Sequence, residues 1–337
     1  MKYSFLFLIL FFNTPLLGQV SKPEDYGFRK LQTIFRGDTV NILIKSKSGE
    51  EVVKKPLFVF CQGSLPIPLM IEYNENSKTG IYQVFAFNTD SICKYYHLAI
   101  IGKPFIPVIV NKKRLNNDFT FIDSTGEFPI GYIKRNLPDY YTDRNIEAIK
   151  FLQKQNWVSK ESLVIAGHSE GSTIAAMIAT KLPAVTHLIY ACGNPLGRFL
   201  TSIQQQRAEE NDSARTAENM FDFWEQIVAD SSNMNAKKGD TFKATYDFSL
   251  PPMQYLEKLK IPVLVCYGTQ DFNAPYNDYF RLDIIRKKRK NFTFKAYEGL
   301  EHNFFPKSKT GIVNYEIYNW DKVGLDWLHW LNKNNLL

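Results

Sequence analysis

The amino-acid sequence predicts an α/β fold, in which a doubly wound, mostly parallel β-sheet is covered by helices on both faces. Short apolar runs recur along the chain, and helix-like segments separate them. One apolar run, at 163–166, leads directly into Gly-His-Ser-Glu-Gly at 167–171, and an apolar helical stretch at 173–181 follows. This order of strand, tight turn and helix is typical of a parallel sheet with a functional residue at its carboxyl edge.

The composition indicates one large globular unit. The chain has 337 residues, of which 45% are apolar and 22% charged, enough for a sizeable core. The formal net charge of +7 is modest, and its one dense basic cluster, at 286–290, contains no aromatic residues. We interpret this cluster as the solvated end of a helix, where cations suit the helix dipole, and we expect no nucleic-acid partner.

Residues 1–18 have the pattern of a secretory signal peptide. Lys2 precedes an unbroken apolar run at 5–12, and Gly18 offers a small residue for cleavage. The run is too short to span a bilayer, and no later stretch is long enough. We therefore expect export to the periplasm or the extracellular space. The mature chain, 19–337, is expected to form one domain without an integral membrane segment; its oligomeric state is left open.

Four cysteines remain after the signal peptide, at Cys61, Cys93, Cys192 and Cys266. Export permits disulfides, but three of these residues lie in or at the ends of apolar strands. Adjacent parallel strands seldom give good bridge geometry, so we expect buried free thiols. The cysteine spacings do not suggest a metal site, and we expect neither a metal nor an organic cofactor.

The strands and helices follow from local pattern. Residues 39–44 alternate between polar and apolar side chains, whereas the other predicted strands are short apolar runs bounded by turn residues. The predicted strands are 39–44, 56–60, 82–87, His97–Ile101, 163–166, His187–Ala191, 261–267 and Phe292–Tyr297. The predicted helices are 142–155, capped by Thr142 or Asp143, then 173–181, 276–290 and 320–331.

Two segments depart from this alternation. Residues 102–141 are poorly periodic and contain several glycines and prolines, which predicts a long loop region near the site. Residues 196–255 are polar and helix-like, with an aromatic patch at Phe221, Phe223 and Trp224. Together with Tyr140 and Tyr141, these aromatic residues could line an apolar substrate pocket. Aromatic residues in such a pattern more often pack helices together.

The Gly-x-Ser-x-Gly sequence at 167–171 predicts a nucleophile elbow with Ser169 as the nucleophile. The turn would hold Ser169 in a strained conformation with its hydroxyl pointing away from the sheet. Side chains at Gly167 and Gly171 would collide with the neighbouring strand and helix. The pentapeptide alone is a weak signal, but its position between a buried strand and an apolar helix favours function.

A serine nucleophile needs a base, and the base needs an orienting carboxylate. Two later loops supply them: Asp271 follows the strand at 261–267, and His302 follows the strand Phe292–Tyr297. Asp271 could merely cap the next helix, and His302 could be a surface histidine. The chain order Ser169, Asp271, His302 nevertheless matches the order that accompanies this elbow.

The oxyanion of an acyl-transfer intermediate needs two backbone N–H donors. Glu170, directly after the nucleophile, is expected to supply one. The loop after the strand at 56–60 should supply the other, with Ser64 first and then Gly63 or Gln62 as candidates, because Gly63 allows a close turn. The role of the Glu170 side chain is left open.

These motifs resemble those of a known superfamily. They are Gly-His-Ser-Glu-Gly at 167–171, Gly-x-x-Asp at 268–271, Gly-x-x-His at 299–302, and a strand with Gln-Gly at 57–63. They look like the α/β-hydrolase superfamily, and the pattern from 146 to 168 is similar to its prolyl-oligopeptidase and dienelactone-hydrolase-like branch. The resemblance covers about 56–305. It implies an eight-stranded, mostly parallel sheet with a helical lid insertion at about 196–255.

The predicted function is that of a secreted serine hydrolase. We expect a carboxylesterase-like enzyme that cleaves an ester of a small molecule through an acyl-enzyme. The runner-up is a serine peptidase for short peptides, although the N-terminal portion is too short for a substrate-restricting β-propeller. A rival from another class is a non-catalytic binding protein on the same scaffold. That rival would be expected to have lost at least one of Ser169, Asp271 or His302.

Overall fold

The structure is a computed structural model that describes residues 21–75, 78–83, 85–210, 215–236 and 239–334. The predicted signal peptide, 1–18, lies outside the described residues, so its export function stays a prediction.

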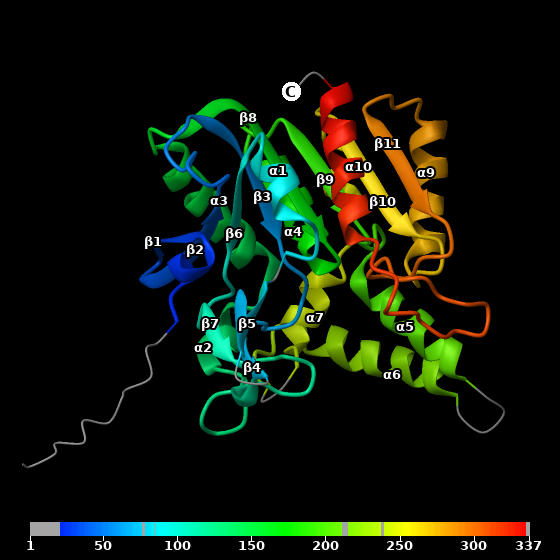
Figure 1. The fold of residues 1–337 in the computed structure, drawn as a ribbon. Coiled ribbons are helices and arrows are strands. Elements are labelled where there is room, and N and C mark those ends of the chain that lie inside the picture. Colours follow the sequence, from blue (N-terminus) through cyan, green and yellow to red (C-terminus); the bar gives the residue numbers. More distant parts are fainter. Residues whose placement is uncertain (1–20, 76–77, 84, 211–214, 237–238, 335–337) are drawn as a thin grey trace, which may run out of the picture.

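An eight-stranded sheet forms the centre of the molecule (Figure 1). Its order is β1 (Phe28–Phe35), β2 (Asp38–Lys45), β6 (His97–Ile101), β3 (Lys55–Cys61), β8 (Val158–His168), β9 (His187–Ala191), β10 (Val263–Gly268) and β11 (Phe292–Tyr297). From β6 to β11 all neighbours are parallel, whereas β1 and β2 are antiparallel to their partners. The predicted eight-stranded, mostly parallel sheet is therefore confirmed, with β1 as a strand that the sequence pattern did not identify.

Helices cover both faces of this sheet. Figure 1 shows α10 (Trp320–Lys333) and α1 (Thr89–Cys93) in front of the sheet, with α3 (Pro138–Gln153) and α4 (Glu170–Lys181) behind it. Successive side chains of a strand point to opposite faces of the sheet, so residues 58 and 60 of β3 share one face. Both phenylalanine rings lie against Trp327 of α10 on that face. The helix α9 (Ala274–Arg286) packs against β10 and β11 through Phe280. Strands buried on both faces explain the continuous apolar runs in the sequence.

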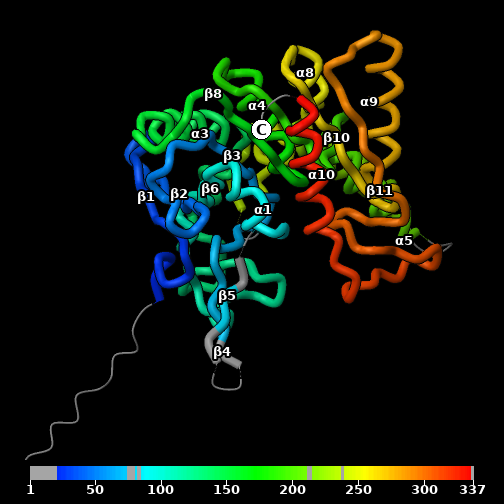
Figure 2. Tube along the Cα trace, turned by 45° about the horizontal axis from the view of Figure 1, so that its top comes forward, coloured from blue at the N-terminus to red at the C-terminus, as the bar shows by residue number. Residues whose placement is uncertain are grey.

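The prediction of a long loop at 102–141 is wrong. This segment contains β7 (Ile109–Asn111), the short 3-10 turn Lys112–Arg114 and α2 (Ile130–Arg135). β7 pairs with β4 (Met70–Glu75), which also pairs with β5 (Lys78–Gln83), and the three strands form a second sheet. This small sheet projects beneath the larger one (Figure 2). A strand of three residues is too short to show a period of two, which is why the pattern was missed.

Two element boundaries also differ from prediction. The strand expected at 82–87 coincides with β5 only at 82–83; Phe85 and Phe87 instead lie outside strands and pack in the core. The helix expected at 142–155 begins earlier, with Pro138 in its first turn, where proline leaves no hydrogen bond unmade. Thr142 is thus inside α3, and its hydroxyl donates to the Pro138 carbonyl at 2.7 Å.

The segment predicted as helix-like, 196–255, contains four helices. They are α5 (Arg198–Glu209), α6 (Thr216–Ala229), α7 (Phe242–Phe248) and α8 (Met253–Leu256). Aromatic side chains hold them together: the ring of Trp224 lies 4.6 Å from that of Phe199 and 5.8 Å from that of Tyr246. In Figure 1, α5 and α6 lie beyond the carboxyl ends of the parallel strands. The aromatic patch therefore packs these helices together.

Four further observations complete the fold. The 3-10 turn Pro23–Tyr26 precedes β1. All four cysteines are buried and unbridged. Among the described residues, no helix combines the length and apolar character needed to cross a bilayer. The basic cluster at 286–290 follows the end of α9, where Arg286 and Lys287 both pair with Asp283.

Candidate active site

Ser169 stands at a strained turn between β8 and α4. Its φ is 57° and its ψ is −128°, in a region that residues with a Cβ rarely adopt. A Cβ on Gly167 would lie 2.1 Å from the Gly171 carbonyl oxygen, and one on Gly171 would lie 2.1 Å from the Cys61 carbonyl oxygen. Strand and helix approach so closely that both positions require glycine, as the elbow pattern predicts.

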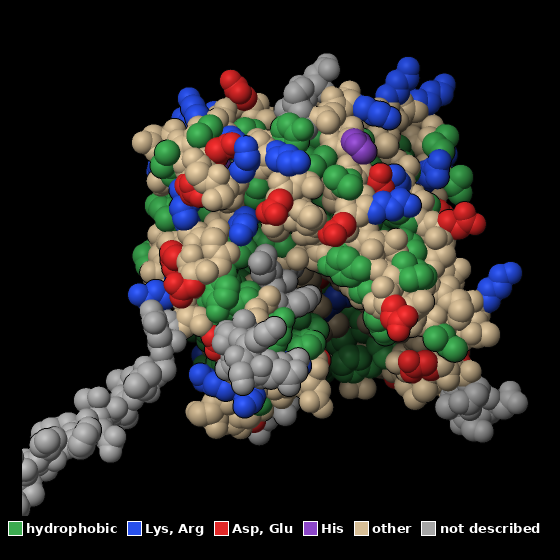
Figure 3. All heavy atoms as spheres, in the orientation of Figure 1, with side chains coloured by type: hydrophobic (Ala, Val, Ile, Leu, Met, Phe, Trp, Pro, Cys, Tyr) green, Lys and Arg blue, Asp and Glu red, His purple; other side chains and the backbone are tan. Residues whose placement is uncertain are grey.

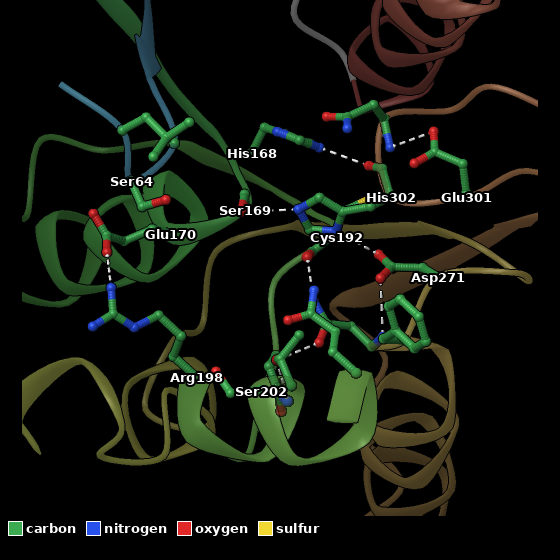
Figure 4. A pocket seen from close by; sticks show the side chains of 18 of the residues that line it. Ser64, His168, Ser169, Glu170, Cys192, Arg198, Ser202, Asp271, Glu301 and His302 are labelled. Carbon is green, nitrogen blue, oxygen red and sulfur yellow. Dashed lines mark hydrogen bonds and ion pairs between the residues drawn. The ribbon is translucent and has the colours of Figure 1, made fainter. Parts of the chain in front are cut away.

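The structure brings Ser169, His302 and Asp271 into one hydrogen-bonded row (Figure 4). Nε2 of His302 lies 2.9 Å from Oγ of Ser169, and Nδ1 lies 2.9 Å from Oδ2 of Asp271. Asp271 is buried in the loop after β10, where its other oxygen accepts the Asn273 N–H at 3.0 Å. The three side chains come from the carboxyl ends of β8, β10 and β11, as the sequence predicts. Their catalytic roles stay a prediction.

The surroundings of His302 set its protonation. Burial acts to lower the pKa of His302, but the Asp271 carboxylate favours the charged ring, and the net pKa is raised above 6.5. With Nδ1–H donated to Asp271, Nε2 is free to accept the Ser169 hydroxyl proton. Asp271 thereby fixes the tautomer that a general base requires.

This shift leads to a pH prediction for hydrolysis. A general base must be neutral, so kcat/KM should fall as the pH is lowered through the pKa of His302. Because that pKa is raised, the acid limb should have its midpoint above 6.5. The measurement is the pH profile of kcat/KM, with circular dichroism at each pH to confirm an intact fold. An acid midpoint below 6.5 in folded protein would contradict the assignment.

A second histidine, His168, supports the loop that carries His302. Its Nε2 lies 2.8 Å from the His302 backbone oxygen, and the two rings are 5.0 Å apart. Burial, followed by the nearby charge of His302, lowers the pKa of His168 to about 3. The neutral ring donates to that carbonyl and is further held by Trp320, 5.0 Å away. Sequence pattern does not predict this contact, because a position inside the elbow does not reveal where the ring points.

Three potential metal ligands lie close together at this site. One ligand atom from each of His168, Cys192 and His302 lies within 4.8 Å of the others. Both ring nitrogens of His302 are already engaged, however, and burial raises the pKa of the Cys192 thiol well above its usual value. A protonated thiol is a poor ligand. The group therefore fits a metal ion poorly, and His302 is instead held between Ser169 and Asp271.

The backbone N–H groups of Glu170, Ser64 and Gly63, three residues of the cavity wall, are the candidate oxyanion donors. Glu170 is the first residue of α4, where the N–H has no partner within the helix, and Ser64 lies in the loop after β3. Neither N–H donates to an acceptor in the part of the chain that the structure describes. Gly63 has an ordinary backbone conformation, and a Cβ there would lie 3.7 Å from the Ser169 Cβ. A close turn therefore does not explain the glycine at 63, contrary to our expectation.

Ser169 opens into a cavity of about 690 Å³, within the size range of small-molecule sites. Figure 3 shows the molecule hollowed between the three-stranded sheet and the helices α5 and α6. The cavity wall includes Ser202, Gln205, Phe248, Phe272 and Val313.

The aromatic residues that the sequence suggested for the cavity are not in its wall. The wall residues do not include Phe221, Phe223, Trp224, Tyr140 or Tyr141. Tyr140 instead donates to Asp38 at 2.6 Å, and Tyr141 donates to Asn136 at 3.1 Å.

Comparison with known proteins adds a partial sequence match. Residues 145–303 match the family model described as BAAT / Acyl-CoA thioester hydrolase C terminal. The match covers a little under half of the chain and includes Ser169, Asp271 and His302. A search of curated proteins found no match.

Solved structures resemble the whole fold. The acylaminoacyl peptidase of Pyrococcus horikoshii is 15% identical, with a TM-score of 0.50 over 82% of this chain and 37% of that one. A puromycin-hydrolyzing peptidase of Mycobacterium tuberculosis is also 15% identical, with a TM-score of 0.50 over 82% of this chain and 36% of that one. Est1E of Butyrivibrio proteoclasticus, solved with bound ferulic acid, is 15% identical, with a TM-score of 0.50 over 81% of this chain and 91% of that one. The chain thus spans little more than a third of either peptidase but nearly all of Est1E.

Proposed function

We propose, on the premise that this chain is a member of the α/β-hydrolase superfamily, that it is a serine esterase acting through an acyl-enzyme. The observation that carries the proposal is the continuous row from Ser169 through His302 to Asp271, with 2.9 Å at each step. A binding protein would have no need to keep this geometry beside a cavity.

The reaction follows from the positions of these groups. Ser169 Oγ attacks the carbonyl carbon of the substrate while His302 Nε2 takes the hydroxyl proton. The negative charge on the carbonyl oxygen is bound by the N–H groups of Glu170 and Ser64. His302 then returns its proton to the leaving alcohol, and the acyl-enzyme forms. Water, activated by the same ring, attacks the acyl-enzyme and releases the acid.

The choice of an oxygen ester or thioester rests on the partial sequence match and on one structural neighbour. The family model is described as BAAT / Acyl-CoA thioester hydrolase C terminal, and Est1E was solved with bound ferulic acid. The family match supports an acyl substrate with a thiol or alcohol leaving group. Short peptides remain the second candidate because two structural neighbours are peptidases.

Two supporting elements are part of the proposal. The helices α5, α6 and α7 act as a lid, because α5 and α7 contribute Ser202, Gln205 and Phe248 to the cavity wall. The leader at 1–18 directs export, so the substrate is encountered outside the cytoplasm. Secretion of a tagged full-length chain, with and without the leader, tests the second element.

A substrate panel tests the reaction class. We expect the purified chain to hydrolyse p-nitrophenyl esters and acyl thioesters, with aminoacyl-nitroanilides at least about 100-fold slower in kcat/KM. A fluorophosphonate probe should label the folded protein and not the heat-denatured protein. Turnover confined to the anilides would replace the esterase proposal by the peptidase. Neither turnover nor labelling would reject both.

A further inference from the structure

A buried group of four charged side chains lies directly beside Ser169. Lys103 and Glu170 expose only 4% of their side chains, and Arg198 and Asp240 are about a quarter exposed. Two charges are positive and two are negative, so the cluster is neutral overall. Charged groups this deep are retained only where partners offset the loss of hydration.

Lys103 contacts the backbone of the loop that follows β3. Its Nζ donates to the Ser64 carbonyl oxygen at 2.9 Å, and the Tyr132 hydroxyl donates to the same oxygen at 3.2 Å. The ammonium also lies 4.8 Å from the ring centroid of Tyr141. Two donors on one carbonyl hold the Ser64–Leu65 peptide plane, because the peptide unit is rigid. The Ser64 N–H belongs to the preceding peptide unit, which meets this plane at the Ser64 Cα.

Lys103 also contacts the first residue of α4. Its Nζ lies 3.6 Å from Oε1 of Glu170, whose other oxygen accepts from Arg198 at 2.7 Å (Figure 4). Arg198 is the first residue of α5 and pairs with Asp240 at 2.6 Å. Lys103 therefore joins the two segments, at Ser64 and at Glu170, that carry the backbone N–H groups assigned to the oxyanion in the proposed function.

We propose that Lys103 is a positioning residue that, with Tyr132, holds the two segments that carry the oxyanion donors in a fixed relative position. The inference rests on the proposed function, and it explains why a lysine is buried beside a nucleophile that it does not contact. Oxyanion donors contribute most when they are held in place before the charge develops. Lys103 does this through the Ser64 carbonyl and the Glu170 carboxylate while its own charge stays away from the reacting atoms.

The test compares two buried lysines. In Lys103→Met, the Ser64 carbonyl and the Glu170 carboxylate both lose the ammonium group that they share. We expect kcat to fall about 10- to 100-fold, with KM changed by less than about threefold. Affinity for an alkyl boronic acid, which forms a tetrahedral adduct with a serine nucleophile, should fall by the same factor as kcat/KM.

The matched control is Lys55→Met. Lys55 is also buried, donates to the Cys93 carbonyl at 3.0 Å and pairs with Glu50, but it lies at the opposite end of β3. That variant should lose stability and keep kcat within about twofold.

A milder variant keeps the test decisive if Lys103→Met does not fold. Tyr132→Phe removes only the second donor to the Ser64 carbonyl and preserves the ring packing, so kcat and boronate affinity should fall together by about 3- to 10-fold. The effects of the two substitutions should be non-additive in the double variant, because both act on one carbonyl.

The inference is overturned if kcat in these variants matches that of Lys55→Met, or if KM rises while kcat and boronate affinity stay unchanged. A wild-type protein that neither turns over esters nor reacts with the fluorophosphonate would instead remove the proposed function on which the inference rests. If the wild-type enzyme is active and Lys103→Met has the wild-type kcat and boronate affinity, only the positioning role of Lys103 is rejected.

Discussion

Ser169→Ala is expected to abolish fluorophosphonate labelling and to lower kcat/KM for the best ester by at least about 10⁴-fold. The loss should be this large because the other members of the row act only through the serine oxygen. Alanine keeps the Cβ, so the strained turn, which is imposed by the close contacts at Gly167 and Gly171, should persist. Labelling is read by mass spectrometry, hydrolysis by initial rates, and the fold by thermal unfolding.

The matched control for this variant is Ser162→Ala. Ser162 lies in the middle of β8, away from the elbow, and its hydroxyl is 3.1 Å from that of Thr186. This protein should be labelled and active like the wild type. Labelling of Ser169→Ala at the wild-type rate would show that another side chain is the nucleophile.

Asp271→Asn should reduce kcat by about 10³- to 10⁴-fold while the site keeps its shape. The asparagine amide can donate to Nδ1 of His302, and the ring would then present an N–H, not a lone pair, to Ser169. In the molecules that retain the correct tautomer, the carboxylate that raises the pKa of His302 is gone. The acid limb of the residual kcat/KM should therefore move to lower pH than in the wild type.

Asp278→Asn is the matched control. Asp278 lies in α9, just after the loop of Asp271, and accepts the Tyr267 hydroxyl. Its substitution should leave kcat within about twofold and the acid limb in place. An Asp271→Asn protein with wild-type kcat, or with an unmoved acid limb, would show that Asp271 does not orient the base.

The inner parallel strands are predictable from the sequence because they are buried on both faces. His97–Ile101 and His187–Ala191 are buried throughout and have the predicted bounds. The edge strand Phe292–Tyr297 also has the predicted bounds, although it is partly exposed. The sequence pattern does not identify β1 because its apolar residues, at 28, 31, 34 and 35, do not alternate with polar ones. The small sheet is missed because β7 has only three residues and pairs with β4 from a distant part of the chain. Local periodicity does not record such pairings.

The same distinction applies to the site. Ser169, Asp271 and His302 were found because each lies in a loop after a recognisable strand, where parallel strands direct functional groups. Lys103 was overlooked because, in sequence, it is one lysine in a segment without periodicity. Its partners Ser64 and Tyr132 are distant along the chain, and they meet only through the tertiary fold.

The hydrogen bond between Ser169 and His302 closes a loop of 133 residues. During synthesis the nucleophile leaves the ribosome long before its base, which follows the outermost strand, β11. A nascent chain that ends before β11 therefore carries the serine at its elbow without a proton acceptor. The proposed hydrolysis therefore requires β11 to have joined the sheet, because His302 reaches Ser169 from the loop that follows this strand.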